Sequence, residues 1–180
     1  NNSPAHDFIM MSSPSDSKVW KAESGKFVEI EKKDWAKPIC GGLIYSPIEI
    51  MMPYKFWNAQ YEGPGRIGQA VHFFILTPPK GERVDGISKV RLALTREFNS
   101  PAQMEFFDEN GNLSKTMALG SVRKIDGLWI MLEASVRQES TRDKDKLRFD
   151  AAKMRADLDK KIFDASMPAE NPPIIDLKKL

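Results

Sequence analysis

The fold of this chain is decided by residues 90–111, which read VRLALTREFNSPAQMEFFDENG. Two runs within this stretch alternate apolar side chains with polar or small ones, and a period of two is that of a β-strand. Asn99-Ser100-Pro101 separates the two runs and Asn110-Gly111 ends the second, as is typical of turns. Each predicted strand therefore has one apolar face. The faces are formed by Val90, Leu92 and Leu94, opposite Arg91, Ala93 and Thr95, and by Ala102, Met104 and Phe106, opposite Gln103 and Glu105.

The same pattern of strand-like runs separated by turn residues extends from about residue 66 to residue 155. Pro78-Pro79 with Gly81, Asp126-Gly127 and the polar run 139–145 supply further turns. These connections are too short for crossover helices, so successive strands must pair as antiparallel hairpins. The sequence thus predicts a mainly β (α+β) fold built on a curved antiparallel meander. Its strand-like segments lie at about 66–77, 87–97, 102–108, 113–123, 127–139 and 145–155.

The segment 39–61 has a different character, because glycine and proline interrupt a run rich in apolar side chains. Ser46, with Glu49 three residues later, matches a capping box, and Pro47 suits the first helical position. We therefore expect a short helix here, which Pro53 ends or kinks. We interpret the segment as a small helical or irregular lid that lies against the sheet.

The remaining segments complete a predicted single domain at 18–166. Ser24-Gly25 separates two strand-like runs, 18–22 and 26–32, which predicts a hairpin. Residues 1–17 are expected to be flexible around an apolar tetrad at 8–11 that can form a short strand.

The C-terminal part is expected to contain one helical turn at 159–166. Residues 167–180 hold three prolines, which favours an extended tail on the surface.

Composition and charge narrow the classes of function. The 180 residues are 41% hydrophobic and 29% charged, near the averages for globular proteins. The 27 basic and 25 acidic side chains are interspersed and leave a net charge of +2, which argues against nucleic acid as a partner. No apolar run approaches the roughly 20 residues of a membrane-spanning helix. The chain begins with Asn and shows no leader, so we expect an exported protein whose signal segment was processed or omitted.

Candidate catalytic and metal-binding residues are few. Cys40 is the single cysteine, which excludes an internal disulfide and a zinc cluster. The two histidines, His6 and His72, lie far apart and form no metal-binding pair. We expect no metal, no cofactor and no enzymatic activity. A hydrolase that uses Cys40 or His72 is kept as a remote alternative.

Two other motifs receive a structural interpretation. Residues 63–68, GPGRIG, fit the dinucleotide-binding pattern G-x-G-x-x-G, but a strand follows them where that motif needs a helix. We interpret them as a glycine-rich turn. Glu105, Asp108 and Glu109 gather around the Asn110-Gly111 turn, where solvated carboxylates are ordinary, and we assign them no catalytic role.

Four quoted segments carry a resemblance to a known family. Residues 90–94 (VRLAL), 100–111 (SPAQMEFFDENG), 115–116 (KT) and 124–129 (KIDGLW) follow one another in an order and spacing that resembles the outer-membrane lipoprotein-sorting proteins, the LolA-like domains. The likeness covers about residues 54–165. It implies an incomplete, curved β-barrel whose open side is covered by helices, with a space between them that holds acyl chains.

The resemblance gives the leading hypothesis for function. It implies a non-enzymatic bacterial protein, periplasmic or associated with the outer membrane, which binds a lipid acyl chain or lipoprotein in an apolar cavity. An envelope protein is a further expected partner. The apolar side chains expected to line the cavity are Phe56, Trp57, Leu92, Leu94, Met104, Phe106, Met117, Leu119, Trp129 and Met131. The alternative is an envelope interaction or adhesion module with a filled β-sandwich that binds partners through its loops.

Overall fold

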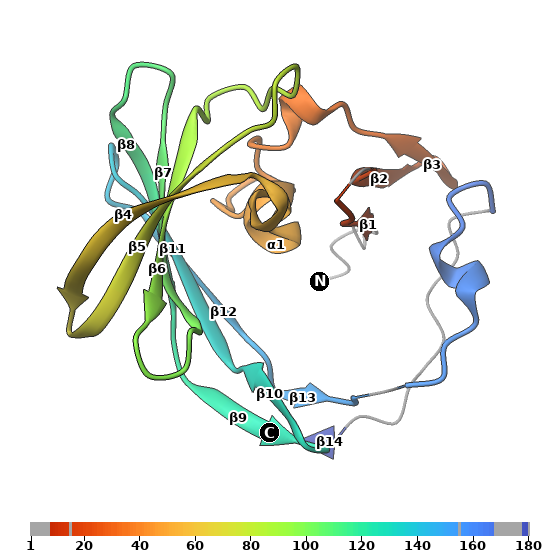
Figure 1. The fold of residues 1–180 in the computed structure, drawn as a ribbon. Coiled ribbons are helices and arrows are strands. Elements are labelled where there is room, and N and C mark those ends of the chain that lie inside the picture. Colours follow the sequence, from red (N-terminus) through yellow and green to blue (C-terminus); the bar gives the residue numbers. More distant parts are fainter. Residues whose placement is uncertain (1–7, 15, 155, 168–177, 180) are drawn as a thin grey trace.

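The computed structural model describes residues 8–14, 16–154, 156–167 and 178–179, and it is dominated by a seven-stranded antiparallel sheet. The strand order is β12-β11-β8-β7-β6-β5-β4. Because β4 and β12 stand at the two ends of this order, the described sheet is not closed into a barrel (Figure 1). The predicted mainly β fold with an open antiparallel sheet is confirmed. The strands are β4 (Asn58–Ile67), β5 (Gln69–Thr77), β6 (Lys89–Thr95), β7 (Pro101–Phe107), β8 (Leu113–Leu119), β11 (Glu133–Gln138) and β12 (Lys144–Arg148).

A hairpin, β9 (Val122–Ile125) and β10 (Leu128–Met131), is inserted between β8 and β11. Two backbone hydrogen bonds continue the ladder into it: the N–H of Gly120 donates to the carbonyl of Glu133 at 2.8 Å, and the N–H of Leu132 donates to the carbonyl of Ser121 at 2.8 Å. The predicted strands 113–123 and 127–139 are therefore each divided in two. The hairpin projects beyond the sheet (Figure 1).

Strand β4 corrects one detail of the sequence interpretation, because the predicted lid 39–61 overlaps it. Residues from Asn58 onward pair with β5, with an irregularity in register between Tyr61 and Gly63. Gly63, Pro64 and Gly65 are typical of turns, so they concealed a strand in the sequence. Proline is tolerated because β4 is an edge strand, whose outward N–H groups need no partner strand.

The predicted short helix is present as α1 (Pro47–Met51), followed by the 3₁₀-helix η2 (Pro53–Phe56). The capping box is complete: the Glu49 carboxylate accepts hydrogen bonds from the Ser46 hydroxyl and, at 2.7 Å, from the Ser46 N–H. Met52 adopts a left-handed conformation with φ 50° and joins the two helices. Figure 1 shows α1 on the inner side of the sheet.

The N-terminal part forms a separate three-stranded sheet, in which β2 lies between β1 and β3. It contains the predicted hairpin and the predicted strand near residue 8, and α1 lies between this sheet and the large one (Figure 1). The flexibility expected for residues 1–7 lies outside the described residues. The elements are β1 (Phe8–Met11), β2 (Lys18–Glu23), β3 (Lys26–Glu29) and the 3₁₀-helix η1 (Lys32–Asp34).

The C-terminal part leads away from β12 and back around the molecule (Figure 1). The predicted helical turn is present as the 3₁₀-helix η3 (Lys160–Phe163). Two short strands, β13 (Ala151–Ala152) and β14 (Lys178–Lys179), pair with each other. Within the predicted tail, residues 168–177 and 180 lie outside the described residues.

Candidate functional site

The inner face of the large sheet, defined as the face against which α1 packs, is apolar in successive rows. Directly paired residues project to the same side of a sheet, so the register identifies each row. One row runs through Leu76, Val90 and Phe106, and the next through Phe74, Leu92, Met104, Met117 and Val136. A third row contains Leu119, Ala134 and Leu147. Strands β5 to β8, β11 and β12 together present one apolar wall.

Helices α1 and η2 cover the first part of this wall. Ile48 and Tyr54 are almost fully buried, with 0% and 2% of their surface exposed. The ring of Tyr54 packs edge-on against Phe106, with 5.6 Å between the ring centroids. Its hydroxyl has no hydrogen-bond partner among the described residues, and burial raises its pKa above the ordinary value. The covered part of the wall is therefore a packed core.

Polar groups fasten the helix to the sheet. The Lys115 ammonium, on β8, lies 2.9 Å from the Glu49 carboxylate and donates to the Ile44 carbonyl at 3.1 Å. The Ile44 N–H in turn donates to the Asp145 carboxylate on β12. Glu49 is fully buried and its two oxygens are shared between Ser46 and Lys115, so its buried charge is paired.

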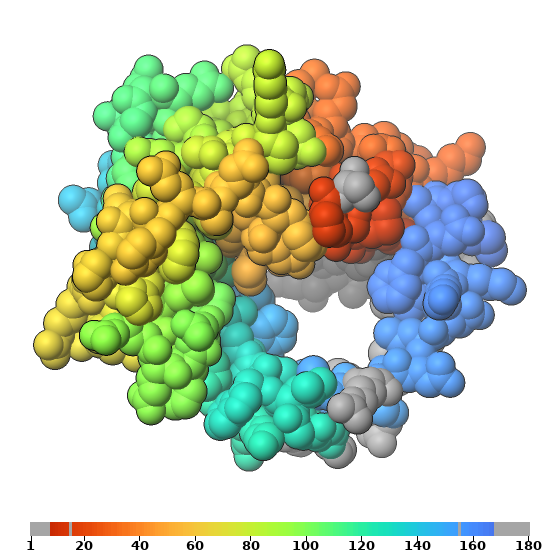
Figure 2. Space-filling model, in the orientation of Figure 1, coloured from red at the N-terminus to blue at the C-terminus, as the bar shows by residue number. Residues whose placement is uncertain are grey.

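The remainder of the wall, here called the open wall, is only partly buried. Its apolar side chains are only half-buried. Figure 2 shows an opening through the molecule, bordered by the part of the chain that includes β9 and β10. Tyr61, with 53% exposure, lies 5.3 Å from the ring of Phe74. The open wall consists of Phe74, Leu92, Leu94, Leu119 and Leu147 of the large sheet, together with Met131 of β10, which packs against the core.

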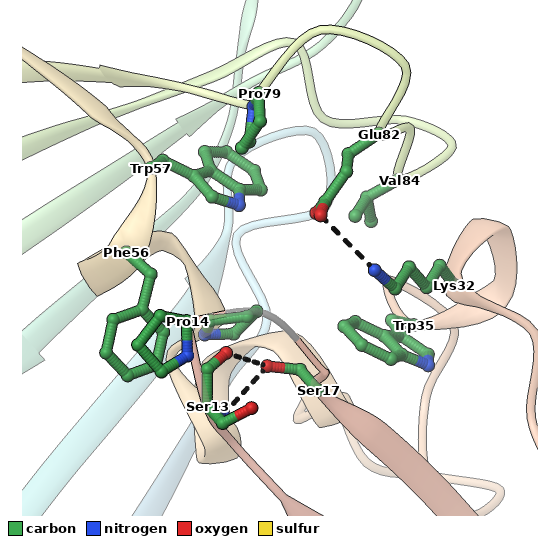
Figure 3. A pocket seen from close by; sticks show the side chains of 11 residues that line it. Ser13, Pro14, Ser17, Lys32, Trp35, Phe56, Trp57, Pro79, Glu82 and Val84 are labelled. Carbon is green, nitrogen blue, oxygen red and sulfur yellow. Dashed lines mark hydrogen bonds and ion pairs between the residues drawn. The ribbon is translucent and has the colours of Figure 1, made fainter.

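A small pocket lies on the other side of the helices, where Phe56 and Trp57 face Ser13 and the ion pair of Lys32 with Glu82 at 3.4 Å (Figure 3). Its volume is about 20 Å³. That volume accommodates about one water molecule, whereas ligand sites usually measure about 300–1,000 Å³. The pocket is too small for an acyl chain.

The predicted lining residues fall into three groups. Met104, Phe106, Met117 and Trp57 are buried beneath or beside the helices, with exposures of 0%, 0%, 2% and 8%. Leu92, Leu94, Leu119 and Met131 belong to the open wall. Phe56, at 37%, and Trp129, at 69%, are exposed. Leu92, Leu119 and Met131 pack half-buried against the core, so their role in lining a cavity stays a prediction.

The sequence did not predict two members of the open wall, nor the ion pair that holds α1 against the sheet. Phe74 lies in the run Phe73-Phe74-Ile75, which is apolar on both faces and so gives no alternation to read. Leu147 lies between Lys146 and Arg148, an alternation that indicates an inward face. The contact of Lys115 with Glu49 joins residues 66 positions apart and leaves no local signal.

The glycine motif has a structural explanation. Gly63 and Gly65 lie within strand β4, so the interpretation of residues 63–68 as a turn is correct only for Gly68, and the expected strand does follow the motif. Gly68 forms the tight turn with φ 75°, and a Cβ atom on Gly65 would lie 2.3 Å from the ring of Phe73. These glycines serve chain reversal and close packing.

The other candidate residues form no recognisable catalytic group. His72 Nδ1 lies 3.0 Å from the Tyr61 hydroxyl, an exposed pair on β5 and β4. Asp108 accepts hydrogen bonds from the N–H groups of Asn112 and Asn110, which lowers its pKa and closes the predicted turn.

Among the described residues, no group of three or more histidine, cysteine or carboxylate side chains could hold a metal ion. No helix in the described ranges is long and apolar enough to cross a membrane.

A comparison with models of protein families shows to which family the chain belongs. The model of a family described as "Uncharacterized protein" matches residues 48–167, which is 120 of the 180 residues. The chain belongs to this family. The matched range starts in α1 and includes the whole large sheet, the hairpin and η3. The comparison with curated proteins finds no match.

Solved structures resemble this family member in fold. A structure from Vibrio parahaemolyticus, described as an outer membrane lipoprotein-sorting protein domain, has a TM-score of 0.68 at 16% identity and covers 87% of the chain. A DUF1329 family protein from Desulfovibrio piger has a TM-score of 0.67 at 16% identity and covers 91%. A LolA superfamily protein from Nitrosomonas europaea has a TM-score of 0.60 at 16% identity and covers 82%.

The chain spans 68%, 72% and 66% of the lengths of these three structures, respectively. At this identity the likeness shows the fold alone. The predicted LolA-like fold is thereby confirmed.

Proposed function

We propose that this protein is a non-enzymatic component of the bacterial cell envelope that binds an acyl chain of a lipid or lipoprotein against its open wall. The observation that carries the proposal is the partial exposure of this wall: five large apolar side chains on the inner face of the large sheet, and Met131 on β10, are only half-buried. A group of partly exposed apolar side chains is typical of a binding site.

The chemistry of the open wall suits an acyl chain. Its members are aliphatic side chains, methionine and one phenylalanine, which favour a flexible chain without polar partners. The ionic groups of the inner face are gathered under the lid, where Lys115 pairs with Glu49. An acyl chain on the open wall therefore meets no unpaired charge from this pair.

The fold supports the same assignment. Structures described as a lipoprotein-sorting domain and as a LolA superfamily protein share it with this chain. A carrier or receptor of acyl chains would act in the periplasm or at the outer membrane, and an envelope protein would be its partner in delivery. We place this chain there on the strength of its fold and its open wall.

A titration with a dansyl-labelled fatty acid tests the proposal. Leu119→Gln places an amide on the open wall and removes about 1.5–3 kcal/mol of apolar contact, which corresponds to roughly 10- to 100-fold weaker binding. Leu113→Gln is the matched control, because Leu113 lies at the other end of the same strand, β8, with 37% exposure. Its probe affinity should equal that of the wild type. No binding by the wild type, or equal weakening by both substitutions, would refute the proposal.

One observation favours a second candidate, an envelope interaction module with a filled core. The interior beneath α1 is packed, and the pocket beside it measures only about 20 Å³. Native mass spectrometry after extraction and readdition of lipid distinguishes the two candidates. Acyl adducts on the wild type support the carrier, and their complete absence supports the interaction module.

A further inference from the structure

The β9–β10 hairpin exposes large apolar side chains that the open wall does not explain. Its turn, Asp126-Gly127, has φ 48° and 85°, the positive values of a tight two-residue hairpin. Trp129, the most exposed of the described tryptophans, has 69% of its surface accessible, and Val122 has 56%. A large aromatic side chain in this position does not stabilise the fold by burial, so its presence calls for a partner.

The register of the hairpin fixes which side chains share a face. Trp129 pairs with Lys124 and Met131 pairs with Val122, so these four side chains project to one side, whereas Ile125, Leu128, Ile130 and Arg123 project to the other. Met131 also packs against the core of the large sheet, as does Leu119. Met131 therefore links the Trp129 face of the hairpin to the core against which Leu119 of the open wall packs. The side chains of Met131, Val122 and Trp129 on this face are here called the strip.

The hairpin also carries basic side chains near its exposed tryptophan. Arg123 and Lys124 are exposed and consecutive on β9, so Lys124 projects to the face of Trp129 and Arg123 to the opposite face, and Asp126 at the turn is the one carboxylate of the hairpin. Tryptophan has an apolar body and a polar N–H, and it concentrates at the boundary between lipid and water. Basic side chains beside it are attracted to anionic headgroups, by about five-fold in affinity for each residue.

We propose that the β9–β10 hairpin is a membrane-contact element that binds the surface of an anionic lipid bilayer. Trp129 enters the headgroup region, Lys124 on its face and Arg123 on the opposite face of the hairpin contact the headgroup phosphates, and the strip through Val122 and Met131 leads from the bilayer toward the open wall. This inference deepens the proposed function and rests on it, because the strip serves to pass an acyl chain between bilayer and wall.

Flotation with lipid vesicles tests the contact. The wild type is expected to float with vesicles of phosphatidylglycerol and phosphatidylcholine, and to bind vesicles of phosphatidylcholine alone at least about tenfold more weakly. Replacing Trp129 by Ser should weaken binding by roughly tenfold or more, since the apolar contact is lost. Arg123→Gln with Lys124→Gln should have a similar effect and flatten the dependence on salt.

A matched pair of valines supplies the control. Val122→Ser should weaken vesicle binding severalfold. Val28, on β3 with 48% exposure, carries the same side chain on another part of the surface, and Val28→Ser should leave binding unchanged. Brominated lipids should quench the fluorescence of the wild type and quench Trp129→Phe much less. Equal binding by wild type and Trp129→Ser, or no binding of anionic vesicles by the wild type, would overturn the proposal.

The acyl-chain site and the membrane contact of the hairpin can be refuted independently of each other. Trp129→Ser should bind the dansyl-labelled fatty acid in solution with wild-type affinity, while its transfer of the probe to vesicles slows. Loss of probe binding in solution by the wild type refutes the acyl-chain site. Unchanged transfer by Trp129→Ser refutes the hairpin as the contact, whatever the affinity of the open wall.

Discussion

The carboxylate of Glu49 lies 2.9 Å from the ammonium group of Lys115, and this ion pair joins α1 to the inner face of the sheet. Glu49 is fully buried and the Lys115 side chain is 12% exposed. A buried pair of this kind leaves a costly charge behind when one partner is removed. The contact therefore decides whether α1 stays on the wall.

Removing one partner of this pair should destabilise the protein strongly. Glu49→Gln leaves the Lys115 ammonium without its counter-charge, and we expect a loss of about 3–5 kcal/mol in the free energy of unfolding. Glu49→Leu combined with Lys115→Met should recover much of this loss. Urea unfolding measures both. As a control, Glu109→Gln breaks an exposed pair with Arg83 and should cost less than about 1 kcal/mol. Equal effects at the two pairs would contradict the assigned role.

Hydrogen exchange should report the same contact locally. Lys115→Met removes the groups that hold the Ile44 carbonyl and Glu49, so the amides of α1 should exchange faster, by roughly a hundredfold. Lys146→Met removes an exposed ion pair with Glu133 on the neighbouring strands and should leave exchange in α1 unchanged. Unaltered exchange in Lys115→Met would show that apolar packing alone holds the helix.

The close contact of Gly65 with Phe73 predicts a steric effect. A Cβ atom at Gly65 would lie 2.3 Å from the Phe73 ring, and the guanidinium of Arg91 covers that ring at 3.7 Å. Gly65→Ala should therefore cost about 1–3 kcal/mol in thermal or urea unfolding. Gly41→Ala has open space around it and should be near neutral. A neutral Gly65→Ala would mean that Phe73 has room to move.

Alkaline stability should depend on Tyr45. Burial raises its pKa to about 12, reinforced by the carboxylates of Asp145 and Glu49. A raised pKa means that folding favours the neutral phenol, so this contribution is complete below the ordinary pKa of about 10 and is lost as the pH rises through 12. Urea midpoints at pH 8 and pH 11.5 should fall less for Tyr45→Phe than for the wild type. The same fall in both proteins would exclude Tyr45 as the source.

The sequence predicted the framework of this fold well, because local chemistry specifies it. Alternation in 90–111 identified β6 and β7, and turns such as Asn110-Gly111 and Asp126-Gly127 required antiparallel pairing. The capping box of Ser46 and Glu49 placed the short helix correctly. These features involve residues that are close in the chain.

The details of the candidate site were less accessible, because they depend on distant residues. No local pattern distinguishes Met104, which the lid buries, from Leu92 on the same inner face, which is half-exposed. That difference arises only when α1 covers part of the wall. Likewise, β4 was hidden because its glycines and proline are typical of turns, whereas an edge strand tolerates them.

The central claim, that an acyl chain lies on the open wall, is tested most directly by NMR of protein labelled in its leucine and methionine methyl groups. On titration with a saturated fatty acid, the methyl signals of Leu92, Leu94, Leu119, Met131 and Leu147 should shift together and reach saturation. Those of Leu43 and Leu113, exposed elsewhere on the surface, should remain in place. Shifts confined to residues outside the open wall, or no saturable shift at all, would contradict the account.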